Sequence, residues 1–363
     1  MDHRFFMSRA IHLASRARGM TSPNPMVGAV LVKNGKIIAE DYHRRPGTPH
    51  AEALVIEQAR GKARGATLYV SLEPCGHTDK RTPPCTKAII KAGIKKVIIA
   101  MKDPNPKVSG KGIRELKAAG IGVESGVLEE KAKKLNEFYV HYMTAKRPFV
   151  ILKVAMTLDG KIATPMGESK WITGEKARRV VHRMRSSVDA VMTAIGTVRA
   201  DDPELTARIR GGRNPKKIVI DPELDISPGT RLLRLPPETI IVTKKMTGAD
   251  KSNRAKKISS LLNSNIRVIS FKETLHLSWL MERLAQEGIT SLMLEGGSSL
   301  NAHALEDGVV NKVMFFIAPK IMGGRDSYPA VGGKAFKRLA EAYKLKNVST
   351  RRLGEDILVE GYL

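Results

Sequence analysis

The sequence predicts a two-domain protein of the α/β class. Strand-like and helix-like segments alternate along nearly all of its 363 residues, the length exceeds that of one ordinary domain, and the alternation restarts after a polar connector near residue 146. Apolar residues make up 42% of the chain, which is enough for two hydrophobic cores. We therefore expect one domain over residues 1–146 and a second over residues 147–363.

The first domain opens with apolar residues at helical spacing and continues with two apolar runs separated by Asn34 and Gly35. An Asn-Gly pair favours the tight turn of a β-hairpin, so residues 27–40 are predicted to form one. Beyond it, short apolar runs alternate with segments of helical periodicity. We expect helices at 51–59, 85–93 and 110–120, strands at 66–74, 96–101 and 121–127, and a closing helix with a polar connector within 129–149.

The second domain begins with the apolar strand 149–160 and is rich in short runs of Val, Ile and Leu. Runs of this length and composition are typical of strands buried in a sheet. Further strands are expected at 189–194, 217–221, 239–243, 266–271, 291–297, 312–321 and 356–363, with helices at 278–288 and 298–305.

The formal net charge of +26 makes nucleic acid a candidate partner. However, residues 1–146 carry 26 Lys and Arg against 13 Asp and Glu, and residues 147–363 carry 36 against 23, so the excess is spread evenly. There is no basic tail, and few aromatic residues are present to stack on bases. We therefore expect phosphorylated small molecules rather than nucleic acid as partners. An RNA-directed base deaminase with an accessory RNA-binding domain stays the alternative.

The chain has no apolar run of 18 or more residues and no apolar block typical of a signal peptide. These features favour a cytoplasmic protein without a membrane partner. In that setting its two cysteines, Cys75 and Cys85, are better explained by a metal or catalytic role than by a disulfide.

A metal-binding pattern runs through the first domain. The segment HAE at 50–52 and the Pro-Cys pairs at 74–75 and 84–85 approximate the H-x-E…P-C…C arrangement of zinc deaminases. One imidazole and two thiolates fill three tetrahedral positions on Zn²⁺ and leave the fourth for an activated water. A carboxylate that does not bind the metal must then move protons, and Glu52 is placed to do so. The predicted zinc ligands are His50, Cys75 and Cys85.

Prolines precede His50 and Cys85, each just ahead of a helix-like run, and a helix N-terminus favours thiolates. His77 competes as a ligand, but a fourth protein donor would leave no position for water. The alternative interpretation of this metal-binding pattern is a binding module in which zinc is purely structural. An open fourth coordination position, and the need for the carboxylate at position 52, distinguish an enzyme from such a module.

Several segments resemble the bifunctional deaminase–reductase of riboflavin biosynthesis across almost the whole chain. In the first domain they are PNPMVGAV, HAE, LEPCGHTDKRTPPC and DPNPKVSGKGIRELKAAGI, and in the second VAMTLDGKIA, SKWITG, TVRADDPELTAR and LEGGSSL. The resemblance implies a cytidine-deaminase-like three-layer α/β/α domain followed by a dihydrofolate-reductase-like α/β domain that uses NADPH. It also implies deamination of a diaminopyrimidine phosphate, reduction of its ribosyl group to ribityl, and a homo-oligomer. The loop between the two cysteines is about one residue longer than is typical of the family.

The resemblance also assigns residues, position by position. It places Asn24 in the pyrimidine pocket, with Asp103 and Asn105 mainly as loop formers. The implied substrate-binding residues of the second domain are Ser169, Arg185, Leu205, Arg208 and Glu295, the arginines being suited to a sugar phosphate. The implied cofactor-binding residues are Ala155, Trp171, Thr197, Asp201, Ser227 and the turn formed by Gly297, Ser298, Ser299, Leu300, Asn301, Ala302 and His303.

Two features of the second domain are informative without the resemblance. Gly296 and Gly297 join a strand to a helix, and such a turn lets a phosphate approach the free N–H groups of the helix N-terminus. Lys153 is a charged residue within an apolar strand, which is costly unless it has a partner. We therefore place Lys153 in the active site, where it orients the substrate or supplies a proton.

Overall fold

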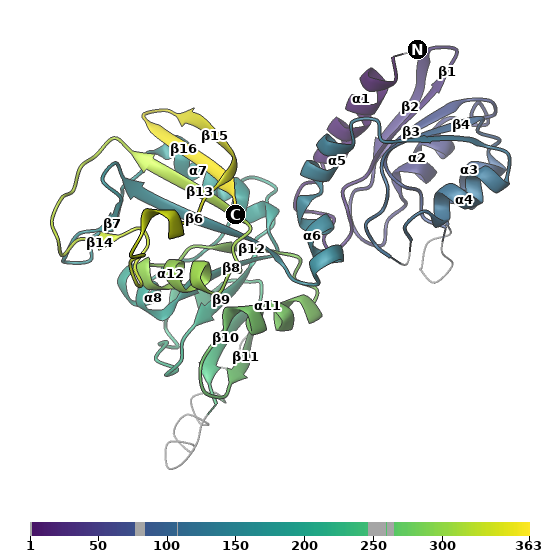
Figure 1. Cartoon of the computed structure of the whole chain (residues 1–363). Helices are drawn as coiled ribbons and strands as arrows, with labels where there is room; N and C mark the ends of the chain where they lie inside the picture. The colour runs from purple at the N-terminus through teal and green to yellow at the C-terminus, as the bar shows by residue number, and fades with distance from the viewer. Residues whose placement is uncertain (1, 77–83, 107, 246–258, 260–264) are drawn as a thin grey trace. The chain divides into compact units, whose positions relative to one another are not determined.

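The computed structural model describes residues 2–76, 84–106, 108–245, 259 and 265–363 (Figure 1). The chain forms two compact units, Met1–Lys146 and Arg147–Leu363, and each is described by itself. Among the described residues, no helix combines the length and the apolar character that crossing a membrane requires.

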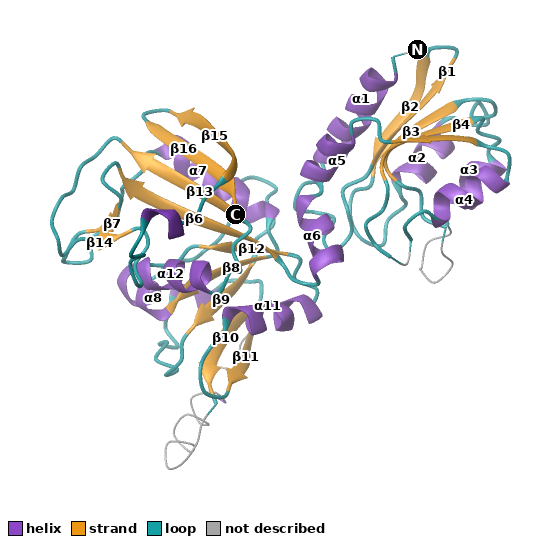
Figure 2. Cartoon of the chain, in the orientation of Figure 1, coloured by secondary structure: helices purple, strands orange, loops and turns teal. Residues whose placement is uncertain are grey.

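The first unit is a five-stranded sheet between two layers of helices (Figure 2). Its strand order is β2-β1-β3-β4-β5, in which β1 is antiparallel to its two neighbours and β3, β4 and β5 are parallel. Helices α1 and α5 cover one face, and α2, α3 and α4 cover the other. The elements are α1 (His3–Ser15), β1 (Gly28–Lys33), β2 (Lys36–Tyr42), α2 (Ala51–Gln58), β3 (Thr67–Leu72), α3 (Cys85–Lys91), β4 (Lys96–Met101), α4 (Lys111–Ala118), β5 (Gly122–Ser125), α5 (Glu129–Leu135) and α6 (Glu137–Ala145).

The core of this unit follows from its central strands. β1, β3 and β4 are buried along nearly their whole length, because helices cover both faces of the sheet. Helix α1 lies so close to β1 that a Cβ on Gly28 would approach the Ala10 carbonyl oxygen to 2.1 Å. Only glycine fits at this crossing, since backbone atoms of a packed helix cannot move aside cheaply.

The second unit is a nine-stranded sheet of order β11-β10-β9-β8-β12-β6-β13-β16-β15, with a small two-stranded sheet beside it. The seven strands from β11 to β13 are parallel, and β16 and β15 add antiparallel strands at one edge. Its strands are β6 (Phe149–Thr157), β7 (Lys161–Ala163), β8 (Ala190–Ala194), β9 (Lys216–Ile220), β10 (Thr239–Lys244), β11 (Ile266–Phe271), β12 (Ser291–Leu294), β13 (Lys312–Ala318), β14 (Tyr328–Pro329), β15 (Lys346–Leu353) and β16 (Asp356–Tyr362). Its helices are α7 (Glu175–Ser187), α8 (Ile195–Asp201), α9 (Arg231–Arg234), α11 (Leu277–Gln286) and α12 (Ser298–Glu306), with a 3₁₀ turn at Leu339–Glu341.

Several local features differ from the sequence-based expectations, among them helices α7, α8 and α9 and the short strands β7 and β14, which were not predicted. The closing helix predicted within 129–149 is two helices, α5 and α6, which meet at Asn136 with φ −101° and ψ 27°. Strand β15 was not predicted, because its residues are polar and nearly all exposed, without the alternation that marks a half-buried strand. It owes its extended form to the pairing with β16.

Candidate active sites

Three potential metal ligands of the first unit meet at one point. His50 is the N-cap of α2, Cys85 is the first residue of α3, and Cys75 lies in the loop after β3. The His50 Nδ1 atom is 3.1 Å from Cys85 Sγ and 3.6 Å from Cys75 Sγ. The three ligand atoms all lie within 4.8 Å of one another. One imidazole and two thiols in this arrangement suit a tetrahedral zinc ion with an open fourth position.

The helix starts explain why these groups converge. A proline precedes both His50 and Cys85, and its fixed φ suits the residue just ahead of a helix. A hydrogen bond from the Cys85 thiol, and then one from His50, lower the pKa of the Cys75 thiol, and the backbone N–H of Cys85 also contributes. A lowered thiol pKa favours the thiolate form, which is the form that binds a metal ion.

Glu52 lies in the first turn of α2, two residues beyond His50, and is 3% exposed. Burial raises the pKa of its carboxyl group. Its Oε2 atom has no hydrogen-bond partner among the described residues. A buried carboxylate with an unused oxygen next to a metal-ligand cluster fits a group that takes up and releases protons.

A cavity adjoins this cluster, and its lining includes Asn24, Asp103 and Tyr139 together with His50, Glu52 and Cys75. Asn24 thus lines a cavity next to the metal-ligand cluster. Asp103 accepts a hydrogen bond from the Asn105 backbone N–H at 2.9 Å, so these two residues shape the loop beside the cavity. The competing ligand His77 lies outside the described residues.

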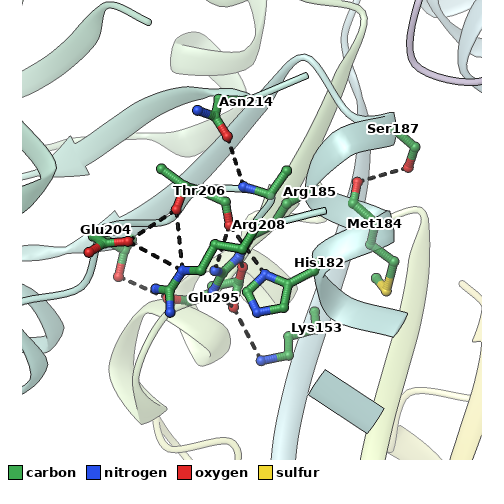
Figure 3. A network of polar contacts seen from close by, with 12 residues as sticks. Lys153, His182, Met184, Arg185, Ser187, Glu204, Thr206, Arg208, Asn214 and Glu295 are labelled. Atoms are coloured by element: carbon green, nitrogen blue, oxygen red, sulfur yellow. Dashed lines mark hydrogen bonds and ion pairs between the residues drawn. The ribbon is translucent and has the colours of Figure 1, made fainter. Parts of the chain in front are cut away.

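Lys153 and Glu295 meet in the second unit, although 142 residues separate them (Figure 3). Lys153 donates a hydrogen bond to Glu295 Oε2 at 3.2 Å. Arg185 donates from Nε to Oε1 at 2.6 Å and from Nη2 to Oε2 at 3.0 Å. Both cations hold the pKa of Glu295 well below its usual range, against the opposing effect of burial. The partner that the apolar surroundings of Lys153 require is therefore Glu295.

Replacing Glu295 with glutamine is expected to lower the free energy of unfolding of the second unit by about 3–5 kcal/mol at neutral pH, because two buried cations lose their counter-charge. The depressed pKa of Glu295 stabilises the fold above the unfolded-state pKa of about 4.3, and this contribution is lost as the pH falls towards the folded-state pKa. Denaturant titrations at neutral and acidic pH would show the difference between wild type and variant shrinking on acidification. Glu282→Gln, at an exposed ion pair with Arg147, is the control and should change stability by less than about 0.5 kcal/mol. An equally small effect of Glu295→Gln would contradict the prediction.

The residues implied to bind substrate are only partly free to do so. Arg185 is committed to Glu295 and to the Thr206 carbonyl oxygen, so it orders the site rather than presenting a free guanidinium. Arg208 is half-exposed, and its Nε lies 3.3 Å from Glu204 Oε2, with which it forms an ion pair, and 3.3 Å from Thr206 Oγ1. Leu205, which precedes Thr206 in the chain, is buried and has a φ of 54°. Ser169 donates a hydrogen bond to Asp201 at 2.8 Å.

Some of the implied cofactor residues lie at two neighbouring helix starts. Strands β8 and β12 are parallel neighbours, and α8 and α12 begin just beyond their carboxyl ends. Thr197 and Gly297 lie side by side here, since a Cβ on Gly297 would be 3.6 Å from Thr197 Oγ1. Two adjacent helix N-termini offer N–H groups to a diphosphate.

The side chains at the start of α12 differ in their exposure to solvent. Ser298 and Ser299 are at least partly exposed, whereas Leu300, Asn301 and Ala302 face the interior. Asn301 donates its amide to the Ala330 carbonyl oxygen at 2.8 Å. These three residues can therefore meet a ligand only through their backbone.

The remaining cofactor candidates are scattered. Trp171 is 62% exposed, with the Arg178 guanidinium 4.6 Å from the centre of its ring. Ala155 lies on β6 two residues beyond Lys153, and His303 faces Asp307 at 3.4 Å. Ser227 lies in an exposed turn before α9, where it accepts hydrogen bonds from the residues that follow it.

The polar network around Glu295 also includes residues that the sequence analysis did not single out (Figure 3). His182 donates from Nδ1 to the Thr206 carbonyl oxygen at 3.3 Å, and burial, followed by the charge of Arg185, lowers its pKa. His182 precedes Arg185 by three positions on α7. Residues three positions apart lie on the same face of a helix, so this spacing is the sequence signal that could have identified His182.

Fold and sites together define a bifunctional enzyme in which a zinc-dependent deaminase unit is joined to an α/β reductase unit. The model of the cytidine and deoxycytidylate deaminase zinc-binding region matches residues 1–101, and that of the RibD C-terminal domain matches residues 148–359. The chain belongs to the RibD family of riboflavin biosynthesis proteins. It is a deaminase and reductase that uses zinc in the first unit and NADPH in the second.

Relatives and solved structures agree with this assignment. The riboflavin biosynthesis protein RibD of Actinobacillus pleuropneumoniae is 44% identical over 360 residues, covering 98% of this chain and 94% of the relative. RibD of Acinetobacter baumannii superposes with a TM-score of 0.90 at 35% identity, covering 99% and 98% of the two chains. The deaminase/reductase of Thermotoga maritima gives a TM-score of 0.88 at 40% identity, with the same coverage.

Proposed function

We propose that the first unit deaminates 2,5-diamino-6-(5-phosphoribosylamino)pyrimidin-4-one and that the second reduces the product with NADPH to 5-amino-6-(5-phosphoribitylamino)uracil. The observation that carries the proposal is the cluster of His50, Cys75 and Cys85 beside the buried carboxyl group of Glu52. The similarity to proteins named as diaminohydroxyphosphoribosylaminopyrimidine deaminase and 5-amino-6-(5-phosphoribosylamino)uracil reductase supports the choice of substrate.

In the deaminase unit, His50, Cys75 and Cys85 would hold a zinc ion, which would lower the pKa of a water molecule and so supply a nucleophile at neutral pH. Glu52 accepts the proton that this water loses and passes it to the ring nitrogen next to the attacked carbon. It then moves a second proton to the departing amine. The carbon–nitrogen bond breaks, a carbonyl forms, and ammonia leaves. Asn24 holds the pyrimidine in the adjoining cavity.

In the reductase unit, bound NADPH would supply the hydride that C1′ of the ribose needs. Lys153 carries the proton needed when the sugar ring opens, and Glu295 keeps its ammonium group charged and in place. Arg208, which is half-exposed and paired with Glu204 through Nε, is the group of the network that meets the sugar phosphate. The N–H groups at the starts of α8 and α12 would hold the cofactor diphosphate.

The decisive test combines metal analysis with two product assays on the wild-type enzyme. We expect about one zinc per chain, ammonia release from the diaminopyrimidine phosphate, and NADPH oxidation only after deamination has begun. Ammonia release that survives complete removal of zinc, or NADPH oxidation by the substrate before any ammonia appears, would contradict the proposed function.

We also infer that the enzyme works in the cytoplasm as a homo-oligomer. The exposed edge strand β15, together with the apolar side chains of Val348 and Ile357 on the β15–β16 hairpin, supports self-association.

A further inference from the structure

A buried amide outside the zinc cluster is tied to the chain that carries the pyrimidine-binding candidate Asn24. Asn136, at the junction of α5 and α6, is 2% exposed. Its Oδ1 accepts a hydrogen bond from the Met26 backbone N–H at 2.8 Å, and its Nδ2 donates to the Met26 carbonyl oxygen at 3.0 Å. Both ends of the side-chain amide are thus used on one residue that lies 110 positions away in the sequence.

The position of Met26 gives this contact its importance. Met26 lies in the connection between α1 and β1, and β1 pairs with other strands only from Gly28 onward. Asn24 and Pro25, just before it, line the cavity next to His50 and Glu52. Asn136 therefore supplies the backbone partner that a neighbouring strand would otherwise give to this stretch. Among the described residues, Asn136 is not itself part of the cavity lining.

The start of α6 also holds a second segment that lines the cavity. Tyr139, three residues after Asn136 and so on the same face of α6, donates its hydroxyl to Asp103 Oδ1 at 2.9 Å. Burial, and then the charge of Asp103, raise the pKa of Tyr139, so the hydroxyl stays protonated and able to donate. One helix start thus fixes two chain segments, one carrying Asn24 and one carrying Asp103.

We propose that Asn136 is a positioning residue of the deaminase reaction, whose two hydrogen bonds to Met26 hold Asn24 in place for the pyrimidine. The inference rests on the proposed function, because it concerns the substrate loop of the deaminase site. Asn136 touches neither the metal ligands nor the reacting atoms in this scheme. Its effect reaches the substrate through the backbone between residues 24 and 26.

The test is steady-state deamination by Asn136→Asp, which keeps the shape but places a carboxylate oxygen against the Met26 carbonyl. We expect KM for the diaminopyrimidine phosphate to rise about tenfold with kcat changed much less, since the lost interaction affects substrate binding. Zinc content and NADPH oxidation on supplied deaminated substrate should match wild type. Asn136→Ser, which removes the amide without adding charge, should show the same split between KM and kcat.

A double-mutant cycle separates positioning from general destabilisation. If Asn136 acts through Asn24, then Asn24→Ala combined with Asn136→Asp should be no worse than Asn24→Ala alone. The matched control is Ser71→Ala, which removes a buried hydrogen bond of 3.0 Å to the Gly28 backbone in the same unit and should leave KM within about twofold. Additive effects in the cycle, or a KM unchanged by both Asn136 variants, would overturn the proposal.

Three further outcomes are informative. If both Asn136 variants fail to fold or lose zinc, the residue is structural and the proposal is wrong. If wild-type enzyme releases no ammonia from the diaminopyrimidine phosphate, the proposed function itself fails. If wild type is active and the variants match it, only the inference about Asn136 fails.

Discussion

Replacing Cys85 with serine is expected to abolish deamination and to remove most of the zinc, while reductase activity persists. A serine hydroxyl does not ionise near neutral pH, so one of the three clustered ligands is lost. Even the loss of a group that only orients a ligand costs about 10–100-fold in metal affinity, so a direct ligand should cost at least that much. Metal analysis after dialysis, ammonia release, and NADPH oxidation on supplied deaminated substrate measure the three quantities.

The reductase assay serves as the internal control of this experiment. Cys85 lies in the unit Met1–Lys146, whereas Lys153, Arg185 and Glu295 lie in the unit Arg147–Leu363. The two sites are built from separate residues, so one should survive damage to the other. Equal loss of both activities would show that the second unit depends on the metal of the first.

Glu52→Gln is expected to lower kcat for deamination by about 10²–10⁴-fold with zinc retained, which is the contribution typical of a positioned proton-transfer group. Glutamine keeps the shape of the side chain but cannot accept the proton of the attacking water. The variant should fold at least as well as wild type, because it avoids the cost of burying a carboxyl group whose Oε2 is unpaired among the described residues. Stopped assays of ammonia and zinc analysis on the same preparation provide the measurement.

Glu57→Gln provides a matched control for this substitution. Glu57 lies on the same helix, α2, but its side chain is exposed, so its replacement should leave kcat within about twofold. Substantial deamination by Glu52→Gln would remove Glu52 from the mechanism. Loss of zinc in that variant would instead make it part of the metal site.

Much of the metal cluster could be anticipated because its pattern is local. His50 and Glu52 are two residues apart at a helix start, and each cysteine follows a proline, so the residue types and the start of each helix can be read from short segments. Lys153 was also recognisable, since a charged residue in an apolar strand signals a buried partner. The buried strands β1, β3, β4 and β6 were also recognisable, because each is a largely continuous apolar run in the sequence.

The sequence by itself therefore determined the α/β class, most of the buried strands and the donor set for zinc, and it predicted two domains, whereas helix α7 was not predicted. Only the tertiary structure decided that Glu295 is the partner of Lys153 and Arg185, that Asn136 meets Met26, and that the polar segment β15 is a strand. The physical reason is distance along the chain. Helix starts and apolar runs follow from neighbouring residues, whereas these contacts exist only once sheet order and helix packing bring remote segments together.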